Sequence, residues 1–90
     1  MDNVASIIVV SEHAVVRNGL RGVIEADPRL RVDAATDCGQ QALLALEGGH
    51  ADVMVIDHGG CVRDSLRLSA TIGRRYPATR PLLIARSADA

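Results

Sequence analysis

Lysine is absent from this sequence of 90 residues, and all ten positively charged side chains are arginine. The absence removes lysine from the possible catalytic groups, because arginine stays protonated and does not replace it as a base or nucleophile. The formal net charge is only −1, so electrostatics give no reason to expect direct binding to nucleic acid. A chain of this length forms at most one small domain.

Cysteine is scarce, and long apolar segments are missing. Cys38 and Cys61 form no CxxC pair and have no histidine at metal-ligand spacing, which favours two reduced thiols over a disulfide. No apolar stretch reaches the roughly 18 residues that a membrane-spanning helix requires, and no basic leader precedes the first apolar segment. We therefore predict a cytoplasmic protein without a membrane partner.

Short apolar segments alternate with stretches of helical periodicity. Segments 6–10, 53–57 and 81–85 are almost continuously apolar, which is typical of parallel strands buried on both faces. Segment 30–35 alternates apolar and polar residues, which indicates a strand at the sheet edge. Apolar residues at helical spacing predict helices between these strands. The first helical stripe contains Val16, Leu20, Val23 and Ile24, and the second helix is expected to begin with a capping box formed by Asp37 and Gln40.

This alternation predicts an α/β fold with a parallel sheet, right-handed crossovers and helices on both faces. In such sheets the ligand site lies beyond the carboxyl ends of the strands. Asp57 ends segment 53–57, and Ser11 and Glu12 follow segment 6–10. The carboxylates of Glu12 and Asp57 suit a hard cation such as Mg²⁺, although on chemistry alone solvated carboxylates are the simpler interpretation. A Zn²⁺ site that uses His13, Glu12 and Asp57 is a further alternative, and Ser11 is expected to cap the following helix.

Three segments together resemble the receiver domains of two-component response regulators, especially LuxR-type transcription factors. They are Val9–Leu20, Val53–Asp57 and Arg74–Pro77, and the spacing between Glu12 and Asp57 also suits that family. The resemblance implies a flavodoxin-like sheet with four strands in the order 2-1-3-4 and three helices. It also implies that residues 1–90 form a receiver-like domain without the family's fourth helix, fifth strand and fifth helix.

The resemblance further implies that Asp57 accepts a phosphoryl group from a sensor histidine kinase. Mg²⁺ would then be bound by Glu12, Asp57 and the main-chain carbonyl of Gly59. The chain departs from the family at three places, one of which is Gly60-Cys61 in place of the Met-Pro step that follows the aspartate. Ser11 stands in place of an acidic residue, and Ala85 stands in place of the Ser or Thr at the end of the fourth strand.

These expectations together predict a signalling module and not an enzyme, in the N-terminal regulatory part of a LuxR-type transcriptional regulator. The alternative is a pseudo-receiver that acts only as a protein-interaction module without phosphorylation. A small Mg²⁺-dependent phosphatase or phosphotransferase is less favoured, because no clear general base accompanies the carboxylates. We also expect self-association or binding to another protein chain, because segment 82–85 would be an apolar edge strand.

Overall fold

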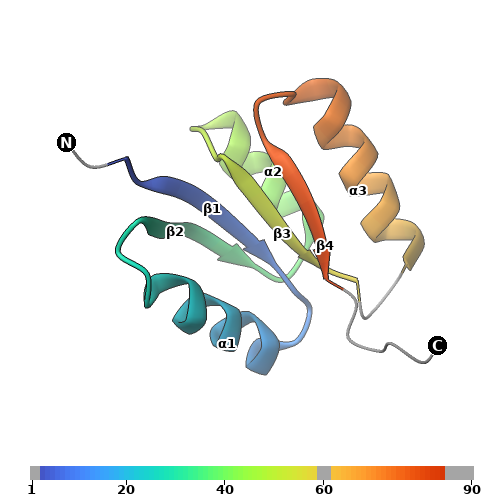
Figure 1. Ribbon diagram of the computed structural model, residues 1–90. Helices are drawn as coiled ribbons and strands as arrows, with labels where there is room; N and C mark the ends of the chain where they lie inside the picture. Colours follow the sequence, from blue (N-terminus) through green and yellow to red (C-terminus); the bar gives the residue numbers. More distant parts are fainter. Residues whose placement is uncertain (1–2, 59–61, 85–90) are drawn as a thin grey trace.

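The computed structural model describes residues 3–58 and 62–84 (Figure 1). Its elements are β1 (Ala5–Val10), α1 (Ala14–Glu25), β2 (Leu30–Thr36), α2 (Gly39–Glu47), β3 (Val53–Asp57), α3 (Val62–Arg75) and β4 (Arg80–Ile84). The predicted alternation of strands and helices is therefore confirmed. No helix in the described part of the chain is long and apolar enough to cross a bilayer.

The four described strands form one parallel sheet in the order β2-β1-β3-β4. This order and the three helices confirm the predicted flavodoxin-like fold class. β1 and β3 lie in the middle of the sheet, which explains why their sequences are continuously apolar. β2 lies at one edge, as its alternating pattern predicts.

The two faces of the sheet carry separate cores, because successive side chains of a strand point to opposite faces. Ile8, Met54 and Ile56 pack with residues of α2 and α3, such as Leu46 and Ile72. On the other face Ile7, Val9 and Val55 pack with partly buried side chains of α1. Figure 1 shows α1 on one side of the sheet and α2 and α3 on the other.

Helix α1 buries little of its own surface against the sheet. Leu20 and Ile24 are half-buried against the sheet, but none of the helix residues is fully buried. The assignment of Val23 to the buried stripe is wrong, since 75% of this residue is exposed. Leu20 and Ile24 lie on one i, i+4 row, and Val23 lies beside this row, about 60° from Leu20 and about 100° from Ile24 around the helix axis, on the exposed side. Val15 is also exposed, at 85%.

A polar network closes the amino ends of the strands. The main-chain N–H of the buried Ser6 donates to Asp52 Oδ2 at 2.8 Å, and the Ser6 hydroxyl donates to the Asp33 carboxylate. The guanidinium of Arg31 and the Ser6 hydroxyl lower the pKa of Asp33. The Ser6 N–H, followed by the ring of His50 at 3.0 Å, lowers the pKa of Asp52. The network connects β1 to β2 and to the segment that precedes β3.

This network predicts a specific loss of stability in acid. Both carboxyl groups have a pKa below the unfolded value of 3.8, so their stabilisation is present above that value and is lost as the pH falls through the folded pKa. The urea midpoint of the wild type should therefore fall as the pH drops through and below 3.8. Asp52→Asn should lower the midpoint at neutral pH and flatten this decline. Asp64→Asn, outside the network, is the control, and equal flattening in that variant would contradict the assignment.

Candidate functional site

The carboxyl ends of β1 and β3 bring Ser11 and Asp57 together. The two strands pair in parallel up to Val10 and Ile56, so the residues that follow lie at the same edge of the sheet. β2, the next strand in the chain, pairs with β1 on one side. β3 pairs with β1 on the other side. Ligand sites of open α/β sheets lie at such a switch point. The structure thus places Asp57 where the sequence predicts it.

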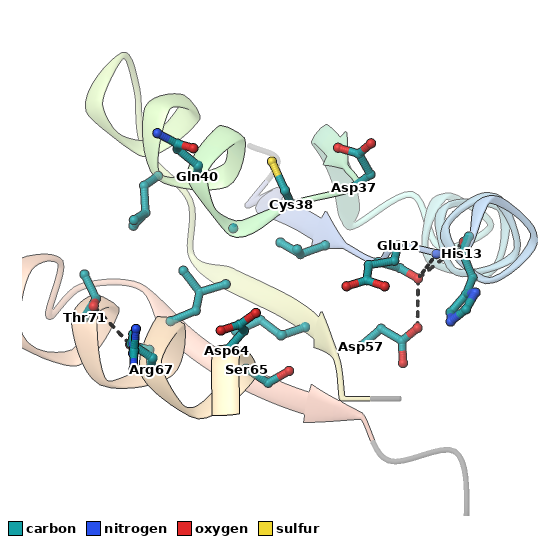
Figure 2. Close-up of a pocket in the computed structure, with 16 residues that line it drawn as sticks. Glu12, His13, Asp37, Cys38, Gln40, Asp57, Asp64, Ser65, Arg67 and Thr71 are labelled. Atoms are coloured by element: carbon teal, nitrogen blue, oxygen red, sulfur yellow. Dashed lines mark hydrogen bonds between the residues drawn. The ribbon is translucent and has the colours of Figure 1, made fainter. Parts of the chain in front are cut away.

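A hydrogen bond joins the two strand ends. The Ser11 Oγ donates to Asp57 Oδ2 at 2.8 Å and accepts the main-chain N–H of His13 at 3.1 Å (Figure 2). Ser11 is only 2% exposed. The prediction that Ser11 caps α1 is wrong, because the N-cap position is His13 and no side chain caps that helix end. The Ser11 hydroxyl instead holds the turn before the helix and orients the Asp57 carboxylate.

The main chain of Ser11 is also held by hydrogen bonds. Its N–H donates to the carbonyl of Thr36 at 3.0 Å, and its carbonyl accepts Nη1 of Arg17 at 2.8 Å. Ser11 is therefore a site residue that sequence reasoning missed as the partner of Asp57. The available signal was a small hydroxyl residue directly after a buried strand whose neighbour ends in an aspartate.

Glu12 and His13 follow at the same end of the site. Both are exposed and line the same cavity as Asp57 (Figure 2). Among residues 3–58 and 62–84, no group of three or more His, Cys, Asp or Glu side chains is placed to bind a metal ion. The Zn²⁺ alternative that includes His13 therefore has no support in this part of the chain. Gly59, the expected carbonyl ligand, lies outside the described residues.

The cavity beside Asp57 has a volume of about 640 Å³ and extends between α2 and α3. Its apolar lining residues are Val10, Ile56, Leu43 and Leu68. Its polar rim consists of the side chains labelled in Figure 2, among them acidic residues from several segments of the chain. A concave site of this size with an apolar lining and a few polar groups is typical of a pocket for a small molecule.

The start of α2 shapes one wall of the cavity. The expected capping box of Asp37 and Gln40 is wrong, because Cys38 is the N-cap residue and no side chain bonds to this helix end. The Thr36 hydroxyl donates to the Cys38 carbonyl at 2.9 Å, which holds the chain before the helix. Asp37 is consequently left on the rim of the cavity, and Cys38 is an exposed free thiol there.

This chain matches known proteins by its structure and not by its sequence. No family model and no curated protein matches the sequence. The signal receiver domain of the response regulator NarL from Mycobacterium tuberculosis aligns with a TM-score of 0.82 and 24% identity, over 94% of this chain and 68% of that chain. The chain has the receiver fold. The predicted resemblance to receiver domains is thus confirmed at the level of structure.

Structures of RcsB support the same conclusion about the receiver fold. Its isolated REC domain from Salmonella enterica serovar Typhimurium, in the presence of the phosphomimetic BeF3⁻, aligns with a TM-score of 0.83 and 20% identity, over 96% of this chain and 64% of that chain. A structure of two RcsB dimers bound to two parallel DNAs aligns with a TM-score of 0.82 and 20% identity, over 94% of this chain. The chain spans only 43% of that larger protein.

The Ser11 hydroxyl predicts a measurable coupling to Asp57. Ser11→Ala should lower the free energy of unfolding by about 1 to 3 kcal/mol, because it leaves a carboxylate oxygen and the His13 N–H without this partner. In a double-mutant cycle with Asp57→Ala, urea unfolding should give a coupling energy of about 0.5 to 3 kcal/mol. Ser69→Ala on α3 is the control and should change stability by less than about 0.5 kcal/mol. Strict additivity of the two site substitutions would show that the hydrogen bond has no energetic role.

Proposed function

We propose that this chain is the receiver-like signalling module of a two-component response regulator and that Asp57 is its phosphoacceptor. The observation that supports this function is the position of Asp57, at the end of a central strand, beside Ser11 and on the wall of an open cavity. An Asp57 oxygen would attack the phosphorus of a phosphohistidine or a small phosphodonor. The bond from phosphorus to the donor breaks as the acyl phosphate forms, and the leaving group keeps the electron pair.

Mg²⁺ is the proposed cofactor of this step. Glu12 and Asp57 offer carboxylate oxygens at the same end of the cavity, and Mg²⁺ uses few protein ligands and keeps several waters. The Gly59 carbonyl is the proposed third ligand. When bound, the ion offsets negative charge on the phosphoryl oxygens. Ser11 contributes a neutral hydroxyl that already donates to Asp57, so the cation site is expected to be weak.

The wider role follows from the same proposal. A sensor histidine kinase would supply the phosphoryl group, and the module would act in the cytoplasm as the N-terminal regulatory part of a LuxR-type transcriptional regulator. It would signal through a change of state and not through catalytic turnover. With a formal net charge of −1, these residues are not expected to contact DNA themselves.

Phosphoryl incorporation tests the assignment of Asp57. Incubation with Mg²⁺ and acetyl phosphate should add the mass of one phosphoryl group to a fraction of the protein, as measured by intact mass spectrometry. Asp57→Asn should abolish the addition, since it removes the nucleophilic oxygen. Ser11→Asp should lower the Mg²⁺ concentration needed for half-maximal labelling, because it adds a negative charge to the cation site.

Asp64→Asn is the matched control for this experiment, since Asp64 is an exposed carboxylate of the same cavity. It should retain the labelling of the wild type. Labelling that persists in Asp57→Asn, or that is unaffected by chelation of Mg²⁺, would contradict the proposed chemistry.

A pseudo-receiver is the second candidate function, and the bond from Ser11 to Asp57 favours it. This buried hydroxyl satisfies one carboxylate oxygen within the protein, so the site is ordered without a cation or a phosphoryl group. Such a domain would act only through protein contacts. The absence of any mass increase at saturating Mg²⁺, in a wild-type protein that is folded, would select this function over the first.

Self-association is the proposed mode of protein contact. β4 ends the order of strands in the described sheet, and Leu82 on this strand is 54% exposed. An apolar edge strand offers its main-chain groups to another strand. The exposed Val15 and Val23 on α1 add apolar surface on the face of the sheet that α1 covers. We therefore expect β4 and α1 to contact a second copy of the chain, or another protein chain.

Sedimentation velocity tests this contact. The wild type should sediment as a larger species as its concentration rises, and Leu82→Glu should shift it toward the monomer by placing a charge on the β4 edge. Leu44→Glu on α2 is matched in exposure, also at 54%, and should leave the distribution unchanged. A wild type that stays monomeric at all concentrations, or an equal effect of both substitutions, would contradict the contact through β4.

A further inference from the structure

The cavity beside Asp57 is much larger than a phosphoryl group and a metal ion require. We define the α2–α3 cleft as the part that leads away from Asp57 between the two helices. Leu43 of α2 and Leu68 and Thr71 of α3 form its walls, and Val10 and Ile56 form its base. The cavity volume of about 640 Å³ lies within the range of small-molecule pockets. The α2–α3 cleft therefore has room for an organic ligand.

The apolar walls of the cleft favour a ligand that carries an apolar group. Leu68 is 8% exposed and Ile56 is 2% exposed, so both belong to the packed core and present a fixed surface. Leu43 packs against that same core from α2. Because Leu68 and Ile56 are already nearly removed from water, a compact hydrocarbon group of the ligand would gain mainly by covering the partly buried Leu43.

The charged side chains around the cleft favour a positively charged ligand. Glu12, Asp37, Asp57 and Asp64 all line the cavity, whereas Arg67 is its one lysine or arginine among the described residues. The four acids come from separate segments of the chain: the loop after β1, the loop after β2, the end of β3 and the first turn of α3. Figure 2 shows the carboxylates of Glu12, Asp57 and Asp64 around the cavity, Asp37 on its rim with the carboxylate pointing outward, and Arg67 beside Thr71. Convergent charge of one sign in a concave site raises the local concentration of the opposite ion.

We propose that the α2–α3 cleft binds a small organic cation, in which an ammonium or guanidinium group faces the acidic end and an apolar body lies between α2 and α3. A bare metal ion would leave the apolar walls uncovered, and an organic anion would meet the carboxylates unfavourably. This site is independent of phosphorylation. It would give the domain a second input, because a ligand in the cleft places its charge beside Asp57.

Two probes with the same phenethyl body and head groups of opposite charge test the selectivity. Phenethylammonium and 3-phenylpropionate are titrated into the ¹⁵N-labelled chain without phosphodonor and without Mg²⁺. The cation should shift the amide signals of Gly39, Leu43 and Thr71 in a saturable manner, with a dissociation constant on the order of 1 mM, as expected for a fragment of this size. The anion should bind at least about ten-fold more weakly. Equal binding of both probes, or no saturable shift in these signals, would overturn the proposal.

Substitutions locate the site within the cleft. Thr71→Phe places a ring into the cleft and should weaken binding of the cation at least about ten-fold, since it occupies the space of the apolar body. Ala70→Phe is the matched control on the neighbouring, exposed position, which does not line the cavity. Asp64→Asn should weaken binding about three-fold through the loss of one partly screened charge.

The same titrations distinguish a real cleft from diffuse attraction to acidic surface. Circular dichroism first establishes that each variant is folded. Equal weakening by Ala70→Phe and Thr71→Phe, or shifts spread evenly over all exposed acids, would contradict binding between the helices. Addition of Mg²⁺ should compete with the ammonium probe, because both would approach the carboxylates at the Asp57 end.

Discussion

The burial of β1 and β3 on both faces is the constraint on which the rest of the structure depends. Val9 and Met54 have no exposed surface, and their neighbours on the same strands are almost as buried. Two adjacent strands of this kind require helices on both sides, and parallel strands require a crossover helix between them. Asp57 and the Ser11–Glu12 step are then placed at one edge, because each follows directly after a buried strand.

The central features of the fold were predictable from the sequence because they rest on long, simple patterns. Segment 53–57 is a continuous apolar run that ends in a carboxylate, and its bounds agree with β3. The position of Asp57 at the edge of the sheet follows from those bounds. The order of the strands came from the resemblance to receiver domains, and the structure confirms it.

Other features depend on three-dimensional detail that no periodic pattern contains. The bond from Ser11 to Asp57 joins residues that are 46 positions apart, so it appears only once the strands are paired. Val23 fits the helical spacing, yet it points away from the sheet because α1 presents only a narrow row of side chains to it. Asp37 fits a capping box by type, but the helix begins one residue later than that motif requires, and Asp37 lies on the rim of the cavity instead.

The two buried serines at the ends of the first strand have a consequence for how the chain avoids misfolding. Ser6 and Ser11 lie near opposite ends of β1, and each donates its hydroxyl to an aspartate of a different neighbouring strand. A slip of β1 by one residue would turn every side chain to the other face. Both buried hydroxyls would then lose their acceptors, at a cost of roughly 1 to 3 kcal/mol each. A shift in the register of β1 would thus cost free energy at both ends of the strand. This cost does not depend on any ligand or partner.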